Sequence, residues 1–187
     1  MPNDFIPNHL SFDAAACTAL IKKIYDLYLN DLSAQLVAIV QKQIFDNGNG
    51  STLMRLSAAA EVRETKREIT DDEICLEVGI DTALLKRSEN VYVRVMVVLH
   101  GNQADGPLMT KPGQATWSKH VLVKRLSSSI TAHPLPGEFN QYDKETDIVS
   151  KVESNISKQT TKYLNAYVRN VKAALDSIDW SAFVKVS

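Results

Sequence analysis

The side chains that could do chemistry in this chain are few and far apart in sequence. The imidazoles are those of His9, His100, His120 and His133. His100 and His120 flank one long loop, so their rings could face each other and hold a metal ion, with Asp105 as a third ligand. No spacing among these histidines is that of a metal-binding motif, and histidines at loop edges usually only form hydrogen bonds. We therefore expect no metal ion and no other cofactor.

A catalytic nucleophile has no better support. Hydrolysis and group transfer need a nucleophile with a base in reach, or paired carboxylates in a dry pocket. The sequence carries no nucleophile elbow, HExxH motif, phosphate loop or dinucleotide fingerprint. The run 48–51 lacks the lysine of a phosphate loop and follows a predicted helix, so we interpret it as a helix stop with a left-handed glycine or asparagine cap. Cys17 and Cys75 have apolar neighbours, and we expect both to be core residues in a reducing compartment.

Length and composition predict one globular domain. The chain has 187 residues, 44% of them hydrophobic and 23% charged, which is enough apolar content for a sizeable core. The formal net charge of -1 provides no overall field that would attract nucleic acid or an anionic membrane. The first ten residues do not resemble a signal peptide, and no apolar run approaches the roughly 18 residues that span a bilayer. We expect a soluble product assembled in a cytoplasm, with neither a membrane nor nucleic acid as a direct partner.

Two long amphipathic helices are predicted, one on each side of the central strands. Apolar residues recur at steps of three and four over 13–45, which is the spacing of one helix face, and Ser11 or Asp13 can cap this helix. The segment 143–178 has a similar stripe, and its early acidic residues suit the positive end of a helix dipole. The stretch 1–12 contains two prolines and is predicted to be an arm that docks on its own domain or on a neighbour. The chain closes with an apolar tail that we expect to be docked, namely Trp180, Phe183 and Val184.

Alternating apolar residues predict an antiparallel sheet between these helices. The clearest strand patterns cover 74–80, 91–99 and 120–126. The stretch 53–69 is ambiguous, because its apolar residues alternate while SAAAEVRETKRE also has good helix propensity. We favour a long charged ribbon of two strands over 53–81, with a turn at 70–72.

Two surfaces are candidates for contact with a partner. Charges of both signs alternate from 61 to 77, which is typical of a solvated sheet face, and the alternative is a subunit contact through Arg63 and Lys66. The loop 101–116 is long for a compact domain, and such loops are usually functional or disordered. Its stiff and apolar residues could grip a neighbour, or the loop could fold back on its own sheet. The candidate contact residues in and beside this loop are Leu108, Met109, Lys111, Pro112 and Trp117.

Three short motifs in the middle of the chain carry a family resemblance. They are ICLEVGID (74–81), LHGN (99–102) and TKPGQATW (110–117), set between the two long helical segments. This order of parts resembles the tail-completion and tail-terminator proteins of long-tailed bacteriophages. The resemblance implies a ring, commonly of six subunits, at the junction between the head connector and the tail tube, without catalysis or cofactor. A ring closed by heterologous contacts needs a projecting element and a receiving groove on each subunit, and the candidates are 61–77, 101–116 and 1–12.

Together these patterns predict a single α+β domain over 1–187, with two long amphipathic helices packed on an antiparallel sheet. It would carry a charged β-ribbon, a long projecting loop at 101–116 and an irregular connection at 127–142. The resemblance favours a non-enzymatic virion component, a ring-forming neck, tail-completion or tail-terminator protein that joins the tail tube to the head connector. The alternatives are a stand-alone protein- or peptide-binding module that uses the 101–116 loop, and an enzyme with an unrecognised site.

Overall fold

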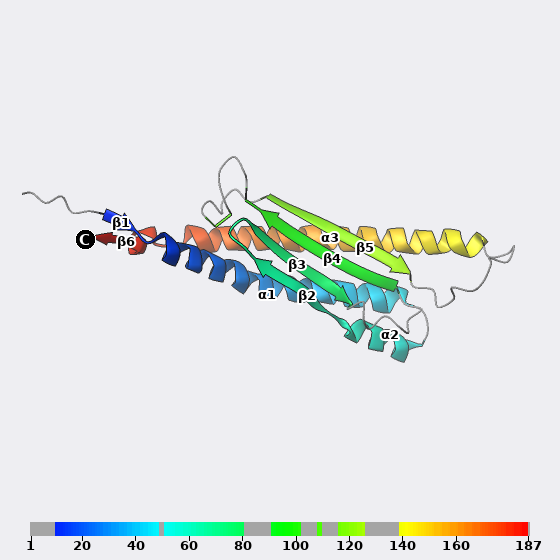
Figure 1. Cartoon of the computed structure of the whole chain (residues 1–187). Helices are drawn as coiled ribbons and strands as arrows, with labels where there is room; N and C mark the ends of the chain where they lie inside the picture. The colour runs from blue at the N-terminus through cyan, green and yellow to red at the C-terminus, as the bar shows by residue number, and fades with distance from the viewer. Residues whose placement is uncertain are drawn as a thin grey trace, which may run out of the picture.

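The computed structural model combines helices with antiparallel strands, which confirms the α+β class. It describes residues 10–48, 51–80, 91–101, 108–109, 116–125 and 139–186. The elements in chain order are β1 (Leu10–Phe12), α1 (Ala14–Asn47), α2 (Thr52–Ala60), β2 (Val62–Ile69), β3 (Glu73–Ile80), β4 (Val91–His100), β5 (Thr116–Arg125), α3 (Phe139–Asp176), the 3-10 helix η3 (Trp180–Phe183) and β6 (Val184–Val186). The molecule is elongated, with β1 and β6 at one end and α2 at the other (Figure 1). None of the described helices is long and apolar enough to cross a membrane.

Strands β2 to β5 form one antiparallel sheet in the order β2-β3-β4-β5. Every second residue of β3 and β4 points to the same side, and pairs such as Leu76 with Val97 are fully buried there. A Cβ added at Gly79 would point to the other side of the sheet and would come within 2.9 Å of the Val93 carbonyl oxygen. The close approach of β4 to β3 at this position therefore requires glycine.

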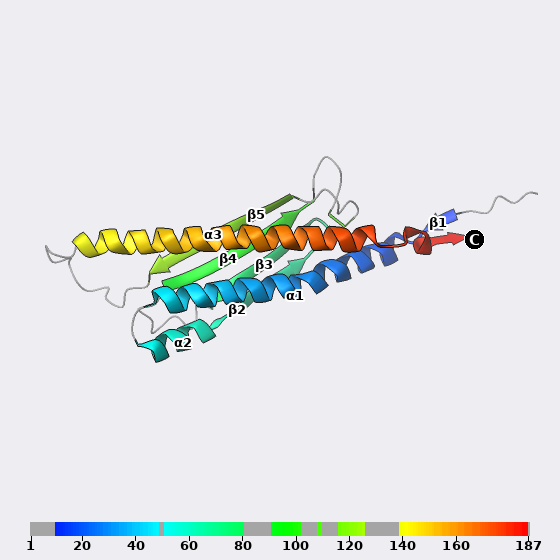
Figure 2. The same ribbon diagram turned by 180° about the vertical axis from the view of Figure 1, so that it is seen from behind.

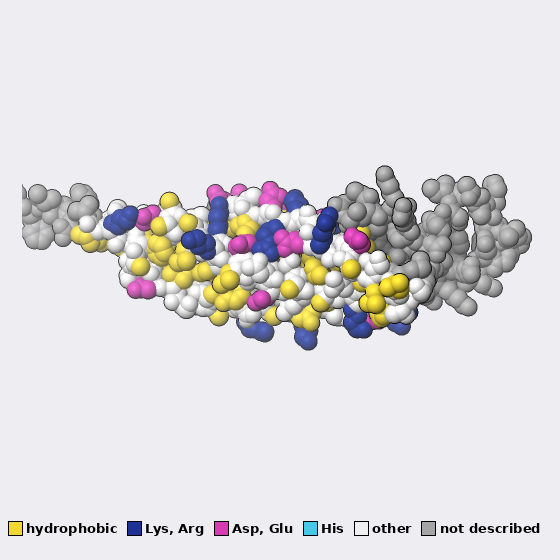
Figure 3. Space-filling view, turned by 90° about the horizontal axis from the view of Figure 1, so that it is seen from below, with side chains coloured by type: hydrophobic (Ala, Val, Ile, Leu, Met, Phe, Trp, Pro, Cys, Tyr) yellow, Lys and Arg dark blue, Asp and Glu magenta, His cyan; other side chains and the backbone are white. Residues whose placement is uncertain are grey.

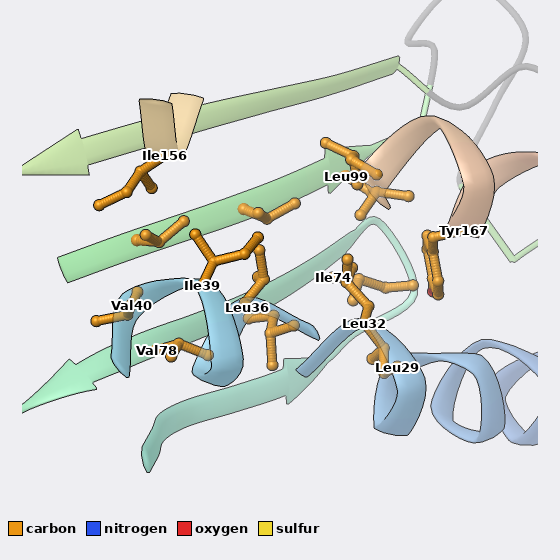
Figure 4. Packing of buried hydrophobic residues seen from close by; sticks show 14 of the residues in the cluster. Leu29, Leu32, Leu36, Ile39, Val40, Ile74, Val78, Leu99, Ile156 and Tyr167 are labelled. Carbon is orange, nitrogen blue, oxygen red and sulfur yellow. The ribbon is translucent and has the colours of Figure 1, made fainter. Parts of the chain in front are cut away.

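Helices α1 and α3 lie side by side and cover one face of the sheet (Figure 2). The buried side chains between the sheet and the two helices form one core, shown in Figure 4 with Leu29, Leu32, Leu36, Ile39, Val40, Ile74, Val78, Leu99, Ile156 and Tyr167 labelled. Removal of such apolar surface from water stabilises a fold by about 25 cal/mol per Å². This core holds the strands and helices together and positions the surfaces described below.

The start of the predicted charged ribbon, residues 53–60, is a helix, so that prediction is wrong before residue 61. Helix α2 occupies this stretch, because its run of leucine and alanine has a helix propensity that outweighs the alternation of apolar residues. It packs on α1 through buried Ala59 and through Arg55, whose guanidinium donates to the Phe45 carbonyl oxygen at 3.1 Å. Strands β2 and β3 do form a hairpin, but β3 also pairs with β4 and is buried beyond Glu73. The hairpin is therefore part of the sheet and not a separate ribbon.

The ends of the long helices differ in detail from the predicted ones. Asp13 is the N-cap of α1, since its Oδ1 accepts a hydrogen bond from the Ala16 N–H at 3.0 Å. At the other end Gly48 is extended, with φ -70° and ψ 156°, so the predicted left-handed cap is not formed there. Helix α3 begins at Phe139, inside the stretch 127–142 that we predicted to be irregular, so its first turn precedes the acidic residues assigned to it.

A β-bulge places two charged residues of β2 on the side of the sheet that the helices cover. The register shifts after Glu64, so Glu64 and Arg67, three positions apart, point to the same side. Arg67 donates to both carboxylate oxygens of Glu64 at 2.8 Å, and its Nη1 donates to Asp26 at 2.7 Å and Asn30 at 2.8 Å on α1. The Ser33 hydroxyl donates to Glu64 at 2.6 Å. These bonds fasten the edge strand β2 to α1.

Replacing Arg67 by methionine should destabilise the fold by about 2 kcal/mol at neutral pH, because Glu64 loses its cation in a half-buried position. Burial raises the pKa of Glu64, but the hydrogen bonds from Arg67 and Ser33 outweigh it and lower the pKa overall. A carboxyl group whose pKa is lower in the folded state stabilises the fold at pH values above its ordinary pKa of 4.5. This contribution is lost as the pH falls through the folded-state pKa. Urea unfolding of both proteins at pH 7 and at low pH should therefore show a difference that shrinks on acidification.

The matched control for this change is Lys66→Met on the same strand. Lys66 pairs with Glu68 at 2.9 Å, and the two side chains are 52% and 53% exposed. An exposed pair contributes little, so this variant should unfold within about 0.5 kcal/mol of the parent. Equal losses for Arg67→Met and Lys66→Met would contradict a special role of the half-buried pair of Glu64 and Arg67.

Candidate functional site

A short two-stranded ribbon closes the end of the molecule at which α1 begins. Strand β1 pairs antiparallel with β6, Leu10 opposite Val186 and Phe12 opposite Val184, and we call these two strands the terminal ribbon (10–12 and 184–186). Paired residues point to the same side of an antiparallel ribbon, so these four apolar side chains share one face. They are exposed by 71% for Leu10, 54% for Phe12, 42% for Val184 and 65% for Val186. The ribbon thus presents an apolar face to solvent.

Asp13 holds the terminal ribbon against α1. Its N–H donates to the Phe183 carbonyl oxygen at 2.8 Å, and its carboxylate pairs with Lys185 at 2.7 Å while it caps the helix. The hydrogen bond from Lys185, followed by that from the Ala16 N–H, lowers the pKa of Asp13. One ionised carboxylate therefore joins the start of α1 to strand β6 of the ribbon.

An apolar cavity of about 280 Å³ opens beside the terminal ribbon. Its lining comes from both ends of the chain and from the loop 101–116, which we call the central loop. The lining residues are Phe12, Ala14, Cys17, Thr18, Ile21, Met109 and Trp180. The Phe183 ring packs beside two of these lining residues, since its centre lies 6.4 Å from that of the Phe12 ring and 6.1 Å from that of the Trp180 ring. Such a lining suits aliphatic or aromatic groups.

The thiol of Cys17 acts as one more apolar group in the lining of this cavity. Burial raises the pKa of Cys17, so the group remains a neutral thiol at physiological pH. The thiolate is the nucleophile and the metal ligand, and a neutral thiol behaves as a small apolar group. Cys17 and Cys75 are both buried, as the sequence predicts, and both are free thiols.

Two candidate contact residues of the central loop lie in the protein's own core. Leu108 is 0% and Met109 2% exposed, and the Met109 N–H donates to the Asp71 carbonyl oxygen at 3.1 Å. The Gly101 N–H donates to Asp72 in the same β2–β3 turn at 3.0 Å. In this structure both side chains are covered by their own chain, which favours the alternative that the loop folds back on its own sheet.

The other candidate contact residues are spread over separate surfaces. Trp117 lies on β5 opposite Leu99, half-buried against the core. Arg63 and Lys66 are exposed on β2, on the face of the sheet opposite the helices. Lys111 and Pro112 lie outside the described residues. Within the described part of the chain, then, the structure does not bring these candidates into one site.

His100 and His120, which could have faced each other across the loop, do not meet. His120 is opposite Met96 and His100 is opposite Thr116, so the two rings are four residues, or about 13 Å, apart along the sheet. His100 instead lies 3.2 Å from the Glu73 carboxylate. Asp105 lies outside the described residues, and within the described ranges no group of three or more metal-binding side chains comes together.

The terminal ribbon was the functional candidate hardest to see in the sequence. Its signal is the alternation of Leu10 with Phe12 and of Val184 with Val186, two patterns too short to stand out. Residues 10–12 of the predicted arm do dock on their own domain, through β6, while residues 1–9 lie outside the described part. Chemically, the ribbon and its cavity can bind an apolar surface of another protein. No family model, curated protein or solved structure matches this chain.

Proposed function

We propose that this chain is a non-enzymatic structural component of a phage virion, a ring-forming neck, tail-completion or tail-terminator protein. It would associate with further copies of itself, six in the rings of the family it resembles, and join the tail tube to the head connector. The observation that carries the proposal is the apolar face of the terminal ribbon. Strands of three residues form a marginal ribbon on their own, and an exposed apolar patch at the end of a molecule marks a protein contact.

The order of parts supports the same family. Residues 74–80 of the first motif lie in the buried strand β3, and residues 99–100 of the second motif end strand β4. Helices α1 and α3 pack on this sheet, as helices do in the family that the chain resembles, although both are longer than is usual there. A stand-alone module that binds a target through the 101–116 loop has less support, because Leu108 and Met109 are buried in their own chain.

A charge placed on the ribbon's apolar face should stop assembly without unfolding the protomer. We expect the double variant Leu10→Glu, Val186→Glu to remain monomeric where the parent forms rings, because a carboxylate in an apolar contact loses its hydration. Both positions are exposed, so the free energy of unfolding should change by no more than about 0.5 kcal/mol. Light scattering coupled to size exclusion gives the mass, electron micrographs show the ring, and thermal melting checks the fold.

The control is Leu122→Glu, on the face of the sheet away from the helices, where the side chain is 40% exposed. This variant should assemble as the parent does. A parent protein that stays monomeric at high concentration would refute the proposal, and so would a ribbon variant that still forms rings.

A further inference from the structure

A second exposed apolar surface lies on α2, at the other end of the molecule. Leu53, Leu56 and Ala60 recur at steps of three and four, so they share one side of this helix. Leu53 is 76% and Leu56 53% exposed, and Ala60 is exposed as well. Figure 3 shows hydrophobic side chains gathered at this end, with charges of both signs along the middle of the molecule.

The α2 surface and the cavity beside the terminal ribbon cannot meet within one copy. The cavity is built on the first turns of α1, from Ala14 to Ile21, whereas α2 follows the far end of the same helix. The 34 residues of α1 span about 50 Å at 1.5 Å per residue. Figures 1 and 2 show the terminal ribbon and α2 towards opposite ends of the molecule in both views. Every copy therefore carries both surfaces, and only two copies can bring them together.

The two surfaces match in size and in chemistry. Truncation of one buried leucine can leave a void of about 150 Å³, so a cavity of about 280 Å³ has room for two leucine side chains. On the rims, the Lys185 side chain of the ribbon is 68% exposed although it is paired with Asp13, and Glu61, directly after α2, is exposed as well. An exposed lysine on one rim and an exposed glutamate on the other can pair when these two ends meet.

We propose that α2 of one copy inserts Leu53 and Leu56 into the cavity of a second copy, beside its terminal ribbon. A contact between two different surfaces of the same chain is heterologous, so it repeats from copy to copy and closes into a ring if the rotation allows. This inference rests on the proposed function, because it names the contact through which copies of a virion component associate. It also assigns a role to α2, which the sequence pattern alone does not suggest.

The test uses two full-length variants that each damage one side of the contact. Leu53→Asp with Leu56→Asp places charges on α2, and Ala14→Phe fills the cavity from an exposed position of α1. Each should weaken self-association on the order of a hundredfold in sedimentation velocity, because an apolar contact then buries a charge or meets a filled cavity. Leu53→Ser with Leu56→Ser removes the same contact without adding charge, should the aspartates disturb α2. Leu27→Asp is the control, since Leu27 is 64% exposed on α1 and belongs to neither surface.

An equimolar mixture of the two variants gives a sharper signature. One variant keeps its cavity and the other keeps its α2 surface, so one intact contact remains and pairs of one copy each should form. Neither variant should pair when alone, and growth beyond the pair should stop. A symmetric contact that uses the same surface twice would not be restored by mixing.

The outcomes separate this inference from the proposed function. If the parent and both variants assemble equally well, the contact lies elsewhere and the inference is wrong, while the proposed function still stands. A mixture that stays monomeric while the parent assembles also overturns the heterologous contact. If the parent itself stays monomeric, both the inference and the proposed function fail.

Discussion

Leu32→Asp is expected to leave little folded protein at room temperature. Leu32 is 1% exposed and points from the middle of α1 into the core between the sheet and α3 (Figure 4). An unpaired carboxylate buried there costs about 4 kcal/mol or more, which is most of the stability of an ordinary domain, about 5–15 kcal/mol. Circular dichroism during thermal and urea unfolding measures the loss.

Leu27→Asp on the same helix is the matched control. Leu27 continues the three-and-four spacing of apolar residues, so the sequence places it on the buried stripe, yet it is 64% exposed in the structure. Its replacement should change the free energy of unfolding by about 0.5 kcal/mol or less. A normal melting curve for Leu32→Asp would mean that the packing of α1 on the sheet is wrong.

Leu108→Ala is expected to destabilise the protomer by about 3 kcal/mol, through lost apolar burial and the cavity left behind. Leu108 is 0% exposed, and the neighbouring Met109 is held to the β2–β3 turn by its bond to Asp71. The two residues thus fix the central loop to the fold. Urea unfolding at neutral pH gives the difference, and Leu10→Ala, at a position 71% exposed, serves as the control with little expected change.

The same variant decides between the two interpretations of the loop. If the loop anchored a neighbour through Leu108, the alanine variant would melt as the parent does and lose only its assembly. We expect instead that the alanine variant melts at a lower temperature than the parent, because Leu108 belongs to the core of its own chain. Shortening the loop by joining Gly101 to Gly113 should likewise reduce the stability of the protomer, because it removes two core residues.

The parts of the fold that could be predicted are those whose pattern is local. Strands β3 and β4 each have one face on the core, so their alternation is unbroken, and α1 carries apolar residues at helical spacing up to a stop at Gly48. In α2 two local signals compete, since apolar alternation and alanine-rich helix propensity occupy the same residues. Packing on α1 decides that competition, and the sequence alone does not show it.

The candidate site depends on contacts between distant parts of the chain, which explains why sequence patterns were a poor guide to it. Arg67, outside that site, gives a parallel case. No sequence pattern around it predicts the β-bulge that turns its side chain towards Asp26 and Asn30 on α1. In the same way, the cavity draws Phe12, Met109 and Trp180 from three separate regions. Local periodicity identifies which residues are apolar, but not which of them the finished fold leaves uncovered.

The pairing of β1 with β6 also sets an order of events during folding. The Lys185–Asp13 bond that accompanies it joins residues 172 positions apart. Closing so long a loop is entropically unfavourable until the intervening chain is compact, so the ribbon can form only after α1 and α3 have packed together. The apolar face and the Trp180 wall of the cavity are therefore completed last. An incompletely folded copy lacks the finished surface, so in the proposed ring such a copy would be left out.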